Sequence, residues 1–375
     1  MMDKPNYINT GEIGSFAYFT VIRRLPAIVR SMIDNNSFDN ETKNELEDLY
    51  AGFPDGELIP LSGSGGVSRR INAEIAAQKI RWNTASFIFA ENYLYHRLKE
   101  ICNYDVNHFD YFAYKKENDV LSKKELLLKI VEESEKLFSG DFGNSLRRIL
   151  HSSLFGNTAD LSQVYTVNEN SVNLLIDDVD KAAGILEAAG QIDIVLDNSG
   201  EELFYDILLS HWLLCKTGIR KINLHFKPFP YFVSDAMIKD FHFLLEALST
   251  NSLGREWKET INGYVSEGKL VLHEDSYWTD TNDYLEIPEN ISRIFSNSDL
   301  VIFKGDLNYR KLVEDRHWNY DTATREIIAF MQKRSLLIRV LKSELITNLD
   351  AVPDTENREW MYNGKYGIIQ LVKRD

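Results

Sequence analysis

Asp197 and Asn198 are the residues whose types and spacing point most directly to chemistry. They follow a largely apolar, β-branched run at 192–196 and precede Ser199, Gly200 and a segment with helical spacing of leucine and isoleucine. This pattern predicts a strand, a tight turn and a helix. Ligands of open α/β sheets bind beyond the carboxyl ends of the strands, where this turn would lie. A carboxylate beside an amide oxygen suits a hard divalent cation.

A second candidate segment carries Asp235, which follows an aromatic, proline-containing stretch at 228–232 and precedes an apolar helix. A carboxylate from another strand end would complete an oxygen-rich site with Asp197 and Asn198. Aspartate and asparagine are also favoured in turns and at helix N-caps. A purely structural role for all three residues is therefore the alternative.

Two further segments end apolar runs with polar side chains. Asp306 and Asn308 follow the strand-like run 300–303 and Gly305, and there they would orient a nucleophile or a sugar hydroxyl. Their alternative role is a solvated turn and cap.

Arg339 and Lys342 interrupt another strand-like apolar run, and Lys365 precedes a last one. Cations inside an apolar run are costly unless they meet an anion, and phosphate is a natural partner for arginine and lysine. An edge strand with solvated charges is the alternative.

Composition excludes several classes of protein. The formal net charge of −15 argues against binding to nucleic acid or to anionic membranes. Two cysteines are too few for a disulfide framework or a structural zinc site, and the histidines lack the spacing of a zinc protease. The first residues lack the apolar core of a signal peptide. We therefore expect a cytoplasmic protein, with access to the nucleus, that binds neither nucleic acid nor membranes.

The apolar pattern changes along the chain. Up to about residue 154 it recurs at helical spacing, and from about residue 164 short β-branched runs alternate with helical stretches. This order predicts an all-helical N-terminal subdomain at 1–165, followed by an α/β domain at 166–375 with a mostly parallel sheet.

Several motifs occur together in an order that resembles the damage-control phosphatase family. The resemblance is greatest to its sugar-phosphate phosphatase subfamily, whose human member has also been described as a protein-glutamate O-methyltransferase. It spans nearly the whole chain and rests on SFAYFTVIRRLPAIV, FAENYLYHRL, IDIVLDNSGEEL, PYFVSDAMIKDF, LVIFKGDLNYRKL, IRVLK and GKYGIIQL.

The resemblance implies a Rossmann-like α/β/α domain after the helical subdomain. It implies a divalent metal, namely manganese, nickel or cobalt with magnesium as a further candidate, held by the residues at Asp197, Asn198 and Asp235. The family's phosphate-holding Arg-Thr-x-Lys motif maps onto 339–342, its late lysine onto Lys365, and a glutamate implicated in methyl transfer onto Glu202. Two positions depart from the family pattern, namely Val340 in place of threonine and Glu201 in place of an aromatic residue.

The resulting hypothesis is metal-dependent hydrolysis of small sugar phosphates, such as fructose 1-phosphate, fructose 6-phosphate or related damaged phosphometabolites, by a monomer. Arg339, Lys342 and Lys365 would hold the phosphate, and Asp306 would orient the nucleophile or the sugar. Asn308 and Glu202 would also contact substrate. Water is the expected nucleophile, and direct attack by Asp197 is the alternative.

Two rival functions remain open at this point. One is a protein-glutamate methyltransferase that uses S-adenosylmethionine, although the first strand ends in a turn with only one glycine. The other is a sugar-phosphate binding protein without catalytic activity.

Overall fold

The computed structural model describes residues 3–155, 173–281 and 283–373. Within these ranges seven strands form one sheet in the order β1-β7-β6-β5-β2-β3-β4. Strands β2 to β6 run parallel, β7 is antiparallel to β6, and β1 is parallel to β7. The strands are β1 (Asn173–Asp177), β2 (Gln191–Val195), β3 (Lys221–Phe226), β4 (Leu270–Glu274), β5 (Leu300–Lys304), β6 (Ser335–Val340) and β7 (Tyr366–Val372).

Helices cover both faces of the sheet because the central strands carry apolar side chains on both sides. Leu300 and Ile302 of β5 pack into one core, and the alternate residues Val301 and Phe303 pack into the other. The first face is covered by α7 (Ala113–Ser139), α8 (Phe142–Phe155), α9 (Val179–Ala188), α10 (Glu201–Lys216), α11 (Ile238–Leu248) and α12 (Ser252–Ser266). The second is covered mainly by η3 (Ser276–Thr279), α13 (Glu289–Ser296), α14 (Gly305–Val313), α15 (Thr324–Ile327) and η4 (Glu359–Met361). The predicted α/β/α class with a mostly parallel sheet is confirmed.

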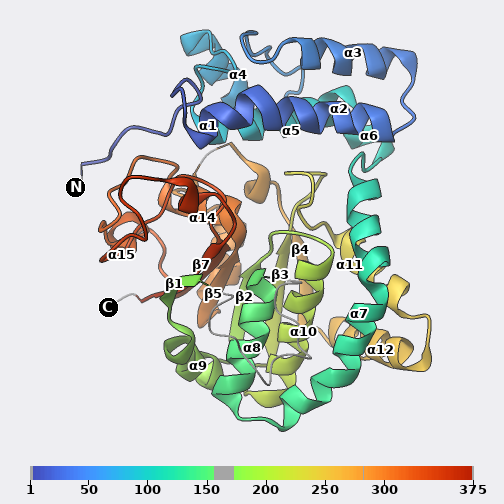
Figure 1. Ribbon diagram of the computed structural model, residues 1–375. Helices are drawn as coiled ribbons and strands as arrows, with labels where there is room; N and C mark the ends of the chain where they lie inside the picture. Colours follow the sequence, from blue (N-terminus) through green and yellow to red (C-terminus); the bar gives the residue numbers. More distant parts are fainter. Residues whose placement is uncertain (1–2, 156–172, 282, 374–375) are drawn as a thin grey trace.

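The remaining helices form a separate layer across one end of the sheet (Figure 1). They are α1 (Phe16–Phe19), η1 (Thr20–Arg24), α2 (Leu25–Asn35), α3 (Asn40–Ala51), α4 (Gly66–Gln78), α5 (Phe87–Ile101) and α6 (Tyr104–Asn107). Their apolar core also includes Phe229, Tyr231 and Met237 from the segment after β3, and Leu307 from α14. The helical N-terminal region therefore covers the carboxyl ends of the strands.

Two helices expected in the first half pack elsewhere. Leu127 of α7 and Leu146 and Leu150 of α8 are buried in the core shared with the sheet. The chain passes from the helical layer to the α/β domain near Phe112, because the Phe112 side chain is still buried in the helical core. The predicted boundary at 165 lies outside the described residues and stays a prediction. No described helix is long and apolar enough to span a membrane.

One buried arginine joins the helical layer to the α/β domain. The Arg310 side chain on α14 pairs with Glu91 of α5 at 2.6 Å and with Asp315 at 2.8 Å, and it is 3% exposed. Each carboxylate is buried, so each depends on this guanidinium for its counter-charge.

We expect Arg310→Met to lower the free energy of unfolding by about 3–5 kcal/mol, because two buried carboxylates lose their partner. Urea unfolding measures this change. The matched control is Arg81→Met, which breaks an exposed ion pair with Glu57 and should have little effect. A loss no larger than that of the control would contradict the prediction.

Candidate active site

The sheet changes its direction of growth between β2 and β5. From β2 the chain adds β3 and then β4 on one side, and it returns to place β5 on the other side of β2. Such a switch point separates the loops after the two strands and leaves a place for a ligand. Asp197 and Asn198 follow β2 here, and Gly305 follows β5. Two predicted site residues therefore lie at the point where this class of fold binds its ligands.

Gly305 allows the two strand ends to meet closely. It has a φ of +81°, in the region that favours glycine, and a Cβ atom built on it would overlap the Asp197 carboxyl group. The carboxylate thus lies directly against the β5–α14 turn. The close approach explains why the Lys-Gly-Asp sequence needs its glycine.

The segment after β3 folds back onto the turn after β2. Asn198 and Asp235 form an isolated antiparallel bridge, and the Ala236 N–H donates to the Asp197 carbonyl oxygen at 2.8 Å. Just before it, Val233 has a φ of +69°, an unfavourable conformation for a β-branched residue. The fold thus uses a strained turn to bring Asp235 beside Asp197 and Asn198, as the three predicted ligands require.

Three acidic side chains crowd this edge. Burial raises the pKa of Asp197 well above its usual range, and the charges of Glu202 and Asp235 raise it further. Burial also raises the pKa of Asp235, against the opposing charge of Lys227. The Asn198 amide lies between the acids: its Nδ2 donates to Asp197 Oδ2 at 2.7 Å and to Glu202 Oε2 at 2.8 Å.

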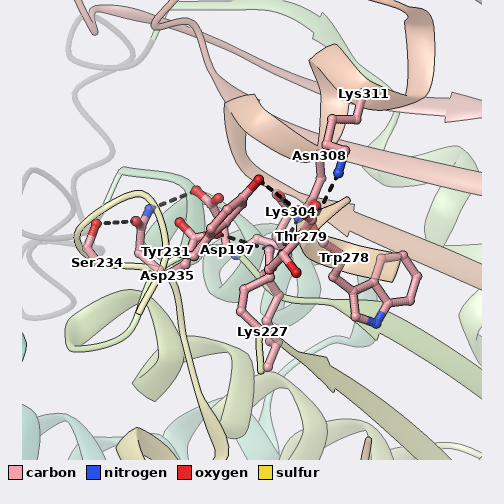
Figure 2. Close-up of polar contacts among 12 residues, drawn as sticks. Asp197, Lys227, Tyr231, Ser234, Asp235, Trp278, Thr279, Lys304, Asn308 and Lys311 are labelled. Carbon is pink, nitrogen blue, oxygen red and sulfur yellow. Dashed lines mark hydrogen bonds and ion pairs between the residues drawn. The ribbon is translucent and has the colours of Figure 1, made fainter. Parts of the chain in front are cut away.

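Two buried lysines at this edge were not predicted from the sequence. Lys227 follows β3, and its Nζ lies 3.1 Å from Asp235 Oδ2. Lys304 ends β5, and its Nζ lies 3.0 Å from Glu202 Oε1 and 2.7 Å from Asp206 Oδ1. Figure 2 shows both lysines with Asp197 and Asp235. Each of these lysines lies at the carboxyl end of an apolar strand, and a cation at that position is a sequence signal that could have found them.

Asp306 organises the turn after β6 instead of facing solvent. Its Oδ1 accepts from Arg339 Nε at 2.8 Å, from the Lys342 backbone N–H at 3.0 Å and from Ser343 Oγ at 3.2 Å. Burial raises the pKa of Asp306, but the charges of Arg339 and Arg310 and the hydrogen bonds from Arg339 and the Lys342 N–H together outweigh it and lower the pKa. Asp306 is therefore an ionised anchor for the segment that holds the predicted phosphate-binding cations.

The predicted cations differ in their availability. Arg339 is 1% exposed and is already paired with Asp306, and its Nη2 donates to Ser343 Oγ at 2.9 Å. Ser343 thus supplies a hydroxyl to this segment, in which Val340 replaces a threonine. The Lys342 side chain is exposed, and its charge acts on both Asp197 and Glu202. We conclude that Lys342 is the more accessible cation.

Asn308 is buried, whereas Lys365 is exposed. Asn308 is fully buried: its Nδ2 donates to the carbonyl oxygens of Leu196 (3.0 Å) and Lys304 (2.7 Å), and its Oδ1 accepts from the Tyr284 hydroxyl. It therefore joins the ends of β2 and β5, which favours a positioning role over direct contact with substrate. Lys365 precedes β7 beside the end of β6, but its side chain makes no hydrogen bond or ion pair with any described residue.

The Glu201 side chain is buried and paired with a lysine. It is 5% exposed, and its carboxylate pairs with Lys123 of α7 at 2.7 Å. Its negative charge is thus compensated from a neighbouring helix, so the departure from the family's aromatic residue adds no free charge to the cleft.

The chain is similar to several known proteins. Residues 20–358 match the family model described as the damage-control phosphatase ARMT1-like domain. The chain is 27% identical over 447 residues to the human protein named damage-control phosphatase ARMT1, with 98% of each chain covered. It is 26% identical over 438 residues to the zebrafish (Danio rerio) protein of the same name, with 98% and 97% covered.

A solved structure supports the fold. A DUF89 family protein from Pyrococcus horikoshii matches with a TM-score of 0.51 and 14% identity, over 94% of this chain and 97% of that chain. At this identity the similarity concerns the fold alone.

Lys304 gives a test of the electrostatic arrangement. Burial raises the pKa of Asp206 to about 6 even though the Lys304 charge lowers it. A carboxyl group whose folded pKa exceeds its unfolded value weakens the fold as pH rises through that range. Lys304→Met should raise this pKa further, so the Tm deficit of the variant relative to wild type should be larger at pH 8 than at pH 5.

Thermal unfolding at the two pH values measures the deficit. Lys136→Met, which removes an exposed lysine, is the control for loss of one positive charge. An equal deficit for Lys304→Met at both pH values would show that Lys304 does not compensate Asp206.

Proposed function

This chain belongs to the damage-control phosphatase ARMT1-like family, and from that premise we propose that it hydrolyses small sugar phosphates in a metal-dependent reaction. Family membership supports a phosphatase role on damaged metabolites. The proposed substrates are fructose 1-phosphate, fructose 6-phosphate and related phosphometabolites. The observation that carries the proposal is the placement of Asp197, Asn198 and Asp235 at the switch point, with Arg339 and Lys342 on the neighbouring strand end.

The donor atoms at this edge fit a divalent cation. The Glu202 charge raises the pKa of both Asp197 and Asp235, and the Asp235 charge raises that of Asp197, so a cation among these acids would relieve their repulsion. No three His, Cys, Asp or Glu side chains in the described ranges form a ready metal cluster. The proposed site uses the two carboxylates and the Asn198 amide that the family resemblance implies. Hard oxygen donors of this kind suit manganese or magnesium, and the affinity of a given site for divalent metals generally rises from manganese to cobalt and nickel.

Asn198 would have to turn its amide to act as a ligand. Its Oδ1 now accepts from Ser234 Oγ at 2.6 Å, and its Nδ2 faces the acids. A hydroxyl can accept as well as donate, so Ser234 remains satisfied when the amide turns by half a rotation. The oxygen would then face Asp197, where a cation needs it.

The chain's own residues supply the second half of the chemistry. When bound, the metal would act as a Lewis acid on a phosphoryl oxygen and compensate developing charge. The Lys342 ammonium group would hold another phosphate oxygen, and Asp306 would keep Arg339 and the Lys342 backbone in place. Lys365 would contribute charge from the start of β7. Water is the proposed nucleophile, and trapping of a phosphorylated Asp197 would replace this step with direct attack.

The geometry gives less support to methyl transfer. Gly200 is the one glycine in the turn after β2, and the Asp119 carboxylate of α7 occupies the space that a Cβ would fill there. A cofactor therefore cannot approach the backbone at Gly200 in this arrangement. Methyl transfer lost on Glu202→Ala would favour the methyltransferase instead, and binding of a sugar phosphate without turnover would favour a non-catalytic binder.

We also propose that the protein is a monomer in the cytoplasm with access to the nucleus. Its proposed ligands are a small phosphorylated sugar and the metal. The formal net charge of −15 supports the absence of nucleic-acid and membrane partners. Both cysteines, Cys102 and Cys215, are free thiols, which agrees with a reducing compartment.

A phosphate-release screen tests the activity. We expect release from fructose 1-phosphate or fructose 6-phosphate with manganese, cobalt, nickel or magnesium. Asp197→Ala should lower kcat/KM at least about 100-fold, because loss of an outer-sphere partner alone costs about 10–100-fold. Asp350→Ala, which removes an exposed carboxylate, is the control. No release from any substrate, or equal release by Asp197→Ala, would contradict the proposal.

Lys342→Met tests the phosphate half of the site. We expect KM to rise about tenfold for a sugar phosphate with a smaller change in kcat, because the lysine contributes a charge-assisted hydrogen bond of about 1.5–3 kcal/mol. Steady-state kinetics at fixed manganese concentration measure both constants, with Lys136→Met as the control. An unchanged KM would remove Lys342 from the site.

A further inference from the structure

Helix α7 connects the helical layer to the loops that carry the candidate ligands. It begins at Ala113, directly after Tyr111 and Phe112, whose side chains are buried in the helical core. From there it packs against both α10 and α11 and runs down the side of the α/β domain (Figure 1). One long element thus spans both parts of the molecule and contacts the two helices that follow Asn198 and Asp235.

Three charged residues of α7 form a stripe on one face. Lys116, Asp119 and Lys123 are spaced at i, i+3 and i+7, which places them on the same side of a helix. We call them the α7 stripe. Lys123 pairs with Asp119 at 2.6 Å and with Glu201 of α10 at 2.7 Å.

The middle of the stripe caps α10. The Glu201 backbone N–H donates to Asp119 Oδ2 at 3.0 Å. The residue before it, Gly200, has no side chain with which to cap the helix, and it has a φ of +69°. A carboxylate at a helix N-terminus stabilises it through the free N–H groups and the helix dipole. Here the cap comes from another helix.

The start of the stripe reaches α11. Lys116 Nζ is buried and lies 2.7 Å from Asp110 Oδ2 and 2.8 Å from Asp240 Oδ2. Asp240 also accepts from the Met237 backbone N–H at 2.9 Å, which closes the first turn of α11. Met237 follows Asp235 by two residues. The same face of α7 therefore contacts the start of both helices that follow the candidate ligands.

We propose that the α7 stripe is a positioning device, which fixes the first turns of α10 and α11 and so sets the spacing of Asn198, Glu202 and Asp235. The inference rests on the proposed metal site. The stripe residues are not among the proposed metal ligands, and their proposed role is to position the helices that follow those ligands. Because α7 starts in the helical core, the stripe also ties the ligand geometry to the docking of the helical layer.

Manganese binding without substrate provides the first test. We expect Asp119→Ala to weaken the affinity for Mn²⁺ by about 10–100-fold, the range for loss of a group that orients metal ligands. Asp119→Asn should lose less, because its amide oxygen can still accept from the Glu201 N–H. Calorimetric titration measures the affinity, and Glu125→Gln, an exposed acid on the same helix, is the matched control.

Amide hydrogen exchange provides a second readout that needs neither metal nor activity. The Glu201 amide should exchange faster in Asp119→Ala than in wild type or in Glu125→Gln. If Asp119→Ala does not fold, a double-mutant cycle tests the proposal in its place. It compares Lys123→Met, Glu201→Gln and the variant that carries both changes. There we expect each single variant to weaken Mn²⁺ binding and the double variant to be no weaker than the worse single one.

The inference is overturned if folded stripe variants bind Mn²⁺ with wild-type affinity and keep the protection of the Glu201 amide. A wild-type protein that neither binds Mn²⁺ nor releases phosphate would instead overturn the proposed function. In that case the exchange of the Glu201 amide still decides whether Asp119 holds α10, so the two failures are distinguishable.

Discussion

The arrangement of this protein depends on holding several buried acids close together at one edge of the sheet. The Glu202 charge raises the pKa of Asp197 and Asp235, and the Asp235 charge raises that of Asp197. Lys227 and Lys304, each placed at the end of a buried strand, compensate part of this charge. Buried carboxylates without partners are costly, so the fold supplies lysines where it can, and a bound cation would complete the compensation.

The same constraint explains the surrounding architecture. Parallel strands place their carboxyl ends at one edge, and the switch between β2 and β5 separates the loops there. The helical layer covers that edge, and Phe229, Tyr231 and Met237 from the segment after β3 are buried in its core. Gly305 permits the close approach of β5 to Asp197. Asn308 joins the ends of β2 and β5 through hydrogen bonds to the Leu196 and Lys304 carbonyl oxygens. Each feature limits how far the acids can move apart.

Local patterns were enough to predict part of this site. The turn at Asp197 and Asn198 follows from an apolar run that stops at polar residues, and parallel strands bring Asp235 to the same edge. The structural roles of Asn308 and Asp306 could not be predicted, because their hydrogen-bond partners, Leu196 and Arg339, are distant in sequence. The packing of α7 and α8 on the sheet was also missed, since helical spacing does not show which layer receives an apolar face.

We propose that Asp197, Asn198 and Asp235 together hold a divalent cation. The most direct measurement is anomalous X-ray diffraction at the manganese edge, from crystals grown with Mn²⁺. We expect one strong peak in contact with oxygen atoms of all three residues. A peak that contacts other residues would contradict the proposed metal site. The absence of a peak near these three residues, in crystals of a protein with manganese-dependent activity, would contradict it as well.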